Sequence, residues 1–161
     1  MNTALKTRTY SIHKPYIAHT LEQAEMAIRR KGERFTAIRK HIYQVLLEAQ
    51  HPLGAYDIIE SLEGVGAQEP ATVYRTLGWL IERGLAAKIA FNSRYTAMPV
   101  GLKADELIFV ICRECGETET VESPKLTETL RQTAKDRGFA ETQMVIEIIG
   151  LCHEHNIGVN S

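Results

Sequence analysis

The stretch Pro70-Ala-Thr-Val-Tyr-Arg-Thr-Leu-Gly-Trp-Leu-Ile-Glu-Arg-Gly84 predicts one helix with two different faces. Proline suits the first helical turn, where its missing N–H would have no partner, and glycine suits the position just after a helix end. The apolar face repeats at helical spacing and consists of Val73, Leu77, Leu80 and Ile81. Thr72 and Arg75 point away from this face, with Tyr74 on its flank. We therefore expect a buried face and an accessible, partly basic one.

The segments around this helix complete the outline of a winged helix-turn-helix. Capping signals and apolar spacing predict three upstream helices, at 20–32, 36–50 and 55–62. After Gly84 the apolar residues alternate, and Asn92-Ser93 offers the turn of a two-stranded hairpin. We expect Trp79, which lies off the apolar face of the fourth helix, to pack against this hairpin. In helix-turn-helix proteins the first residues of the second helix reach base edges in the major groove, so the fourth helix is the predicted reader of DNA.

The accessible face carries side chains that suit DNA. Arg75 can bond guanine through two hydrogen bonds, and Thr72 or Tyr74 can contact the methyl group of thymine. Phosphate contacts are expected from cations around this helix: Lys31, Arg34, Arg39 and Arg94. Any one of these cations could instead be a solvated surface charge. The pattern therefore predicts a DNA-binding surface whose base-reading residues are Thr72, Tyr74 and Arg75.

The residues beyond about position 100 predict a second, different module. Pro99 and Gly101 interrupt any continuing element. Strands are predicted at 106–112, 117–122 and 142–151, with a helix from Ser123-Pro124 to Gly138 before the last strand. Up to Lys103 there are 14 Lys and Arg against 9 Asp and Glu, whereas the remainder has 5 against 11. A unit of this size has little core of its own and commonly needs a metal, a partner chain, or both.

The second module holds all three cysteines, in the patterns Cys112-Arg-Glu-Cys115 and Cys152-His-Glu-His155. Two pairs with this spacing are typical of tetrahedral structural zinc sites, since a tight turn lets both side chains of a pair reach one ion. His155 reproduces the spacing of the first pair, while His153 remains an alternative. A redox pair at Cys112 and Cys115 is the competing interpretation, but such pairs usually open a helix, and an extended acidic segment is expected here. We therefore predict a structural zinc held by Cys112, Cys115, Cys152 and His155.

Composition limits the remaining classes of function. The chain has 161 residues, of which 44% are hydrophobic and 24% charged, as in ordinary globular proteins. No apolar run is long enough to cross a bilayer, and residues 1–10 lack the apolar core of a signal peptide. Three cysteines fit a reducing compartment, so we expect a cytoplasmic protein without membrane contact. No phosphate-binding glycine loop, nucleophile motif or paired-carboxylate site is found, so no catalytic residue and no enzyme activity are predicted.

The combined motifs resemble those of the ferric and zinc uptake regulator (Fur) superfamily, with zinc uptake regulators as the nearest branch. The resemblance runs over roughly residues 19–155 and rests on the segments 34–39, 52–58, 70–77, 112–116 and 150–152. It implies a transcriptional regulator that represses metal-uptake genes by binding palindromic operators as a homodimer. It also implies that Tyr74 and Arg75 contact bases and that Tyr56 contacts the DNA backbone. The implied fold class is α+β, organised as an N-terminal arm at 1–18, a winged-helix DNA-binding domain at 19–98, a hinge at 99–104 and a small zinc-containing α/β dimerisation domain at 105–161.

Two departures from the family pattern concern metal. The second cysteine pair of the family appears here as Cys152 with His155, which still suits zinc. A regulatory metal site near the hinge is usual in the family, yet Leu85–Phe109 contains neither His nor Cys. The remaining candidate ligands are Asp105, Glu106, Glu119, Glu122, His13 and His19. Two alternatives therefore stay open: a family member that does not sense metal, and a zinc-stabilised adaptor that binds protein instead of DNA.

Overall fold

The computed structural model describes residues 14–49, 51–62, 69–101, 104–140 and 144–156. Its contacts divide the chain into two compact units, one within residues 11–102 and the other within 103–161. Among the described residues, no helix is long and apolar enough to cross a membrane. The fold is mixed α+β, as the sequence predicts, and each unit is described by itself.

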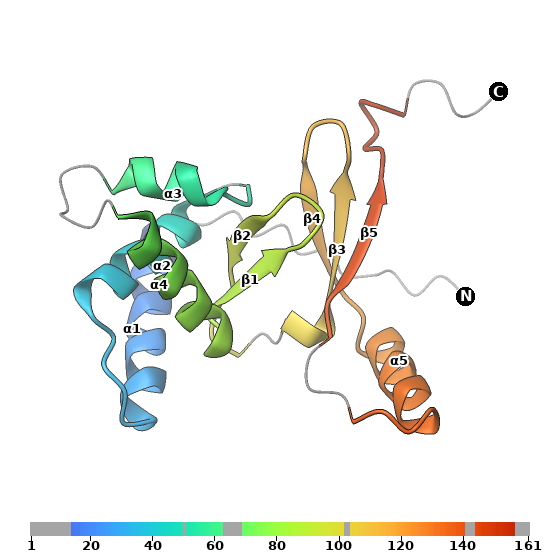
Figure 1. Ribbon diagram of the computed structural model, residues 1–161, viewed down its shortest axis with the longest axis horizontal. Coiled ribbons are helices and arrows are strands. Elements are labelled where there is room, and N and C mark those ends of the chain that lie inside the picture. Colours follow the sequence, from blue (N-terminus) through green and yellow to red (C-terminus); the bar gives the residue numbers. More distant parts are fainter. Residues whose placement is uncertain (1–13, 50, 63–68, 102–103, 141–143, 157–161) are drawn as a thin grey trace. The chain divides into compact units, whose positions relative to one another are not determined.

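The first unit consists of four helices followed by a β-hairpin (Figure 1). Its elements are α1 (Lys14–Arg30), α2 (Ala37–Glu48), α3 (Ala55–Ser61), α4 (Pro70–Glu82), β1 (Ala86–Ile89) and β2 (Arg94–Ala97). Strands β1 and β2 are antiparallel, with Ala86 opposite Ala97. Leu53 adds a short extended segment to the hairpin, because it exchanges two backbone hydrogen bonds with Tyr95 of 2.9 and 2.7 Å. This is the predicted winged helix-turn-helix.

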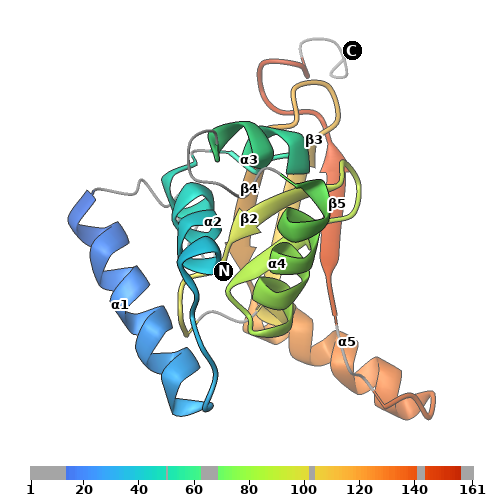
Figure 2. The same ribbon diagram turned by 60° about the vertical axis from the view of Figure 1, so that its left-hand side comes forward.

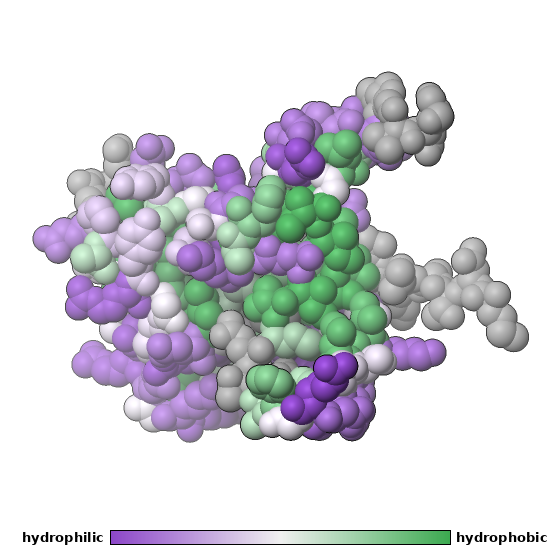
Figure 3. All heavy atoms as spheres, turned by 45° about the vertical axis from the view of Figure 1, so that its right-hand side comes forward, coloured by the Kyte–Doolittle hydropathy of each residue, from purple (hydrophilic) through white to green (hydrophobic). Residues whose placement is uncertain are grey.

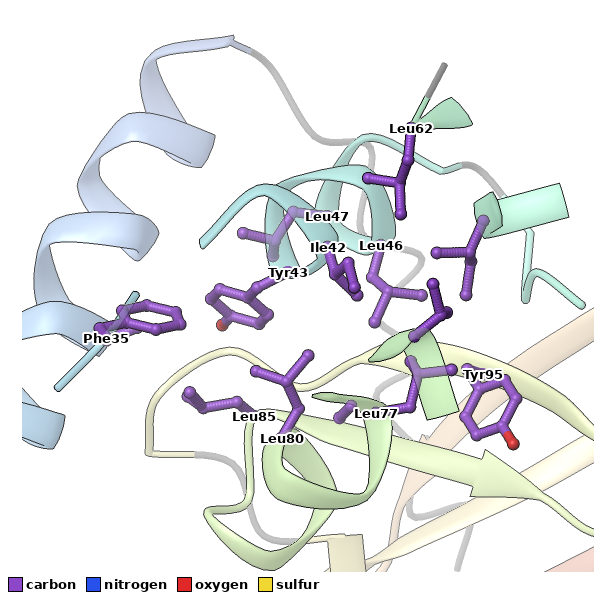
Figure 4. Packing of buried hydrophobic residues seen from close by; sticks show 14 of the residues in the cluster. Phe35, Ile42, Tyr43, Leu46, Leu47, Leu62, Leu77, Leu80, Leu85 and Tyr95 are labelled. Atoms are coloured by element: carbon purple, nitrogen blue, oxygen red, sulfur yellow. The ribbon is translucent and has the colours of Figure 1, made fainter. Parts of the chain in front are cut away.

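The core of the first unit lies between α2 and α4, and α1 runs along α2 (Figure 2). Figure 4 shows the apolar side chains of α2 facing those of α4. The buried residues of these two helices are Ile42, Tyr43, Leu46, Leu47, Val73, Thr76, Leu77 and Leu80. Each buried Leu or Ile stabilises the fold by about 1.5–3 kcal/mol relative to an exposed one. The Tyr43 hydroxyl donates a buried hydrogen bond of 2.9 Å to the carbonyl of Met98, which joins α2 to the residue after the wing.

Helix α4 begins and ends where its sequence predicts. Pro70 occupies the first turn, and Gly84 has a left-handed φ of 71° that glycine adopts without strain. The Gly84 N–H donates to the carbonyl of Ile81, and the Leu85 N–H to that of Leu80, so the last carbonyls of the helix are paired. The chain therefore turns directly from the helix into β1.

Helix α1 begins earlier than predicted. The sequence suggested a start at Thr20, with Thr20 and Gln23 forming a capping box, but the helix already contains Lys14. Thr20 is buried inside it, and its hydroxyl donates to the carbonyl of Tyr16 at 2.8 Å. A threonine hydroxyl can bond a carbonyl one turn back in a helix as readily as it caps one, and burial of Ile17 extends the apolar face by a further turn. Residues 14–18, assigned to the arm, are thus helical.

The second unit is a three-stranded sheet with one helix (Figure 1). Its elements are the 3₁₀ turn η1 (Ala104–Glu106), β3 (Leu107–Cys112), β4 (Thr118–Glu122), α5 (Pro124–Asp136) and β5 (Ile146–Gly150). The strand order is β4-β3-β5, with β3 antiparallel to β4 and parallel to β5. Strand β5 is shorter than the predicted 142–151: Met144 and Val145 precede it, and residues 142 and 143 lie outside the described residues.

Much of the apolar surface of the second unit is exposed. On α5 the apolar side chains of Leu126 and Leu130 are 43% and 40% exposed, and on β5 those of Ile148 and Ile149 are 50% and 47% exposed. Figure 3 shows a broad hydrophobic area on the face turned to the viewer. An exposed apolar area of this kind usually marks an interaction surface.

Candidate zinc site and nucleic-acid interface

The structure brings Cys112, Cys115, Cys152 and His155 together, with their ligand atoms all within 4.8 Å of one another. The Cys115 and Cys152 sulfurs are 3.9 Å apart, and His155 Nδ1 lies 3.9 Å from Cys112 Sγ and 3.1 Å from Cys152 Sγ. In a tetrahedral site with Zn–S bonds of about 2.3 Å, neighbouring sulfurs are about 3.8 Å apart. The donor set and its spacing therefore fit one zinc ion. His153, the alternative to His155, is not a member of this group.

Two backbone turns at the ends of neighbouring strands create this geometry. Cys112 is the last residue of β3, and the Gly116 N–H donates back to its carbonyl at 2.9 Å, with Gly116 at a left-handed φ of 75°. Beyond β5, the His155 N–H donates to the Cys152 carbonyl at 3.0 Å. The Arg113 N–H donates to the Gly150 carbonyl at 2.9 Å, which joins the two turns directly. Parallel pairing of β3 with β5 thus places both ligand pairs at the same end of the sheet.

The thiols differ in their affinity for protons. Backbone hydrogen bonds, first from Cys115 and then from Cys152, lower the pKa of Cys112 to about 6. Burial, together with the neighbouring Cys112 side chain, raises the pKa of Cys152 to about 11. Backbone N–H groups thus favour the thiolate of Cys112, whereas burial favours the neutral thiol of Cys152. A divalent cation held by these side chains would stabilise all three thiolates at once.

Carboxylates near η1 have partners of their own. Arg131 of α5 donates to both the side chain and the carbonyl of Asp105, at 2.5 and 3.1 Å. Among the described residues, the cysteine and histidine group is the one place where three or more potential metal ligands converge. Asp105, Glu106, Glu119, Glu122 and His19 are not brought together there, and His13 lies outside the described residues.

The predicted base-reading residues lie on the accessible face of α4. Tyr74 is 48% exposed, Arg75 is exposed, and Thr72 is half-buried. Tyr56, in the first turn of α3, is 72% exposed. Two tyrosines, one threonine and one arginine are thus available to a partner in the unit that has the winged-helix fold.

Arg94 and Arg34 are placed differently from each other. The Arg94 guanidinium donates to the Pro52 carbonyl at 2.9 Å and lies 3.9 Å from the Asp57 carboxylate. Asp57 also accepts the Gly54 N–H at 2.8 Å, so Arg94 ties β2 to the start of α3. The sequence patterns do not predict this link, although an acidic residue three positions after Gly54 is a capping signal. Arg34 is exposed.

Comparison with known proteins decides the family. The model of the ferric uptake regulator family matches residues 30–149, which is most of the chain. The chain belongs to this family. The Fur-family chain is 28% identical over 138 residues to the zinc uptake regulation protein of Escherichia coli (strain K12), covering 82% of this chain and 78% of that protein. It is 29% identical over 141 residues to the peroxide operon regulator of Bacillus subtilis (strain 168), covering 85% and 94%.

Solved structures show the same fold. A zinc uptake regulator complexed with zinc and DNA superposes with a TM-score of 0.77 at 26% identity, covering 86% of this chain and 93% of that one. The crystal structure of holo XcZur gives 0.72 at 27% identity, with 84% and 96% covered. Proteins of this family are transcription regulators and not enzymes, which removes the redox interpretation of Cys112 and Cys115. The Cys₃His group corresponds to a structural zinc site of this family.

Proposed function

We propose that this Fur-family protein is a transcriptional regulator that binds palindromic DNA operators as a homodimer and represses metal-uptake genes. The observation that carries the proposal is the accessible face of α4 in a winged helix-turn-helix, with Thr72, Tyr74 and Arg75 in its first two turns. A similar protein has been solved in complex with zinc and DNA, which supports the same partner for this chain. The proposed domain organisation is that of the sequence analysis except at the first boundary. Because residues 14–18 belong to α1 and Ile17 to the core of the first unit, the arm is placed at 1–13, the DNA-binding domain at 14–98, the hinge at 99–104 and the dimerisation domain at 105–161.

Reading of DNA is divided among these residues by their chemistry. Arg75 reads guanine through two hydrogen bonds, and Thr72 and Tyr74 contact thymine methyl groups in the major groove. Tyr56, Arg34 and Arg94 contact the phosphate backbone, which positions α4 but carries no sequence information. An adaptor that binds protein would not need this set of side chains at the start of a recognition helix.

Dimerisation uses the exposed apolar side chains of β5 and α5. Strand β5 is one of the two edge strands of the described sheet, and its Ile148 and Ile149 are half-exposed. A second copy of the chain covers these residues when the second units of the two copies meet about a two-fold axis. Such an axis also repeats the recognition helix once on each half-site, and a palindromic operator follows from that symmetry.

The zinc ion has a structural role in this proposal. Cys112, Cys115, Cys152 and His155 hold it and fix the ends of β3 and β5 to each other. Structural zinc contributes about 10–16 kcal/mol of apparent binding free energy in small zinc-dependent peptides. A small sheet with an exposed apolar face gains its stability from this ion and from the partner subunit together.

The proposal is tested by selecting duplexes from a random DNA library with the zinc-loaded full-length protein. We expect enrichment of a palindromic sequence, bound by one dimer, with an affinity that falls as salt is raised. Absence of any enriched sequence, with binding no stronger than to random DNA, would contradict the proposal and favour the adaptor.

A further inference from the structure

Trp79, the single tryptophan of the chain, lies on α4 four residues after Arg75. Residues at this spacing are neighbours on one face of a helix, so Trp79 continues the DNA-reading face by one turn. The sequence predicts that its ring packs against the hairpin, but the described contacts are with the segment between α1 and α2 and with the first turn of α2. Its ring centre is 5.9 Å from that of Phe35, and the Arg39 guanidinium carbon lies 3.9 Å above the ring.

Polar contacts complete the surroundings of this ring. The indole Nε1 donates to Glu33 at 3.1 Å, and the same carboxylate accepts the Arg83 Nε at 3.0 Å. Burial acts to raise the pKa of Glu33, but the Arg83 hydrogen bond and charge, the Trp79 N–H and the Arg39 charge hold it below its ordinary value. Glu33 therefore remains a charged acceptor for α4.

Arg39 was one of the cations expected to contact phosphate. In the structure its Nη1 donates to the Arg34 carbonyl at 2.7 Å, and its guanidinium lies over the indole ring. The energy of a guanidinium–ring contact depends on how the two groups are oriented, and so does the energy of the indole hydrogen bond. We call the group of Glu33, Phe35, Arg39, Trp79 and Arg83 the Trp79 cluster.

The Trp79 cluster adds directional restraints to the apolar packing that holds α4. The hydrophobic contribution of that packing depends on the buried area and has no directional preference of its own. The ring contacts and the Nε1–Glu33 bond are directional and act on the same face as Arg75. Recognition side chains need support to within about 10–20° of their productive orientation. A rotation of α4 would displace the Arg75 guanidinium from a base edge, whereas phosphate contacts elsewhere would persist.

We propose that Trp79, held by Arg39 and Glu33, is a positioning residue for DNA reading that sets the rotation of α4 and thereby the discrimination between operator and other sequences. This inference rests on the proposed function, because it needs an operator that Arg75 reads. The Trp79 cluster acts through Arg75 and does not touch DNA itself.

Two conservative variants test the inference. Trp79→Phe keeps an aromatic ring against Phe35 but removes the Nε1 donor, and Arg39→Lys keeps the charge but loses the planar stack. Arg29→Ala, which removes an exposed cation in the last turn of α1, is the matched control. Dissociation constants are measured for the selected operator and for a random duplex of equal length, over a range of salt, and melting temperatures show that each variant is folded.

We expect both variants to lower the ratio of operator to random affinity about fivefold, with an unchanged salt slope, and the control to leave both quantities unchanged. In an Arg75→Ala background the same substitutions should change the ratio less than about twofold, because contacting networks are non-additive. A lower melting temperature with an unchanged ratio would assign the cluster a structural role only. A third variant, Arg39→Ala, removes the charge as well, and a salt slope reduced by about one in this variant would make Arg39 a phosphate contact and overturn the inference. Loss of operator preference in the unmodified protein would instead contradict the proposed function.

Discussion

Arg75 is the residue on which sequence discrimination is expected to depend. It is exposed on α4, in the second turn after Pro70. Arg75→Ala removes the two hydrogen bonds to guanine. It should weaken binding to the operator by about 1–3 kcal/mol and leave binding to random DNA nearly unaffected. Competition binding at one fixed salt concentration measures both. Lys135→Ala, which removes an exposed cation from α5, is the control. An equal loss on operator and random DNA would show that Arg75 does not read bases.

Arg94 is expected to act on all sequences alike. Its side chain is 44% exposed although its guanidinium is bound to the Pro52 carbonyl. The same guanidinium can therefore hold the β1–β2 hairpin in place and contact a phosphate. Arg94→Ala should weaken operator and random DNA by the same factor and reduce the salt slope by about one. Arg94→Lys should keep the slope, because the charge remains. If Arg94→Ala lowers the melting temperature and leaves the slope unchanged, the residue only fastens β2 to α3.

Strand β5 is the element that is expected to carry dimerisation. Ile148 is half-exposed at the sheet edge, beside Val110 of β3 in the parallel register. Ile148→Asp places a charge in the proposed interface and should raise the dimer dissociation constant by about tenfold or more. Met26→Asp is the matched control, since Met26 is equally exposed but lies on α1. Sedimentation equilibrium gives both constants, and an unchanged value for Ile148→Asp would move the interface elsewhere.

The Cys₃His group joins the ends of β3 and β5, so loss of its zinc should affect the fold and the dimer as well as the metal content. Cys115→Ser removes one of four ligands, and the strand ends of β3 and β5 would then be connected by backbone hydrogen bonds alone. We expect the variant to lose its zinc and its dimeric state together, because structural zinc contributes folding free energy directly. Metal analysis after dialysis and sedimentation test this. Retention of one zinc per chain in a dimeric Cys115→Ser protein would show that the ligand set is wrong.

Local sequence signals predicted the helices and turns that contain them. They failed to predict the position of a side chain whose contacts are with residues far away in the sequence. Pro70 and Gly84 bound α4 because each has a conformational preference of its own. The ligand turns are likewise local, since two residues separate the members of each pair. The predicted helix start at Thr20 was wrong because a threonine hydroxyl suits both a helix cap and a helix interior. The burial of Ile17 distinguishes the two positions. The predicted packing of Trp79 against the hairpin was wrong because its hydrogen-bond partner, Glu33, lies 46 positions away in the sequence. No local pattern reveals such a contact.

The exposed stripe of α5 shows a related limit at the level of elements. Leu126 and Leu130 recur at helical spacing, and the apolar face of an amphipathic helix usually packs inside its own unit. They are exposed instead, while Thr127 is the residue of α5 that is buried. Periodicity identifies an apolar face, but it does not say whether the face is covered by its own chain or by another. In a family of dimeric regulators, we expect the partner chain to cover this face.

At the scale of the whole molecule, zinc can affect operator binding in two ways that must be separated. Removal of the structural ion should abolish dimerisation and with it operator binding. A second, regulatory ion would need ligands near the hinge, where Leu85–Phe109 has neither His nor Cys and the Asp105 carboxylate is held by Arg131. Carboxylates alone favour harder ions than zinc. Once the structural site is filled, we therefore expect operator affinity to change less than about tenfold with free zinc.

The measurement is an operator titration at several buffered free-zinc concentrations, all high enough to keep one zinc per chain. A sensor must bind its ion with different affinity in two states of the molecule, and a tenfold rise in operator affinity corresponds to a coupling free energy of about 1.4 kcal/mol. Such a rise would contradict the prediction and require a second site. His13→Ala and His19→Ala would then locate it, since these histidines are the candidate ligands that the N-terminal residues supply. A flat titration, with dimerisation intact throughout, would leave occupancy of the Cys₃His site as the one step at which zinc controls this regulator.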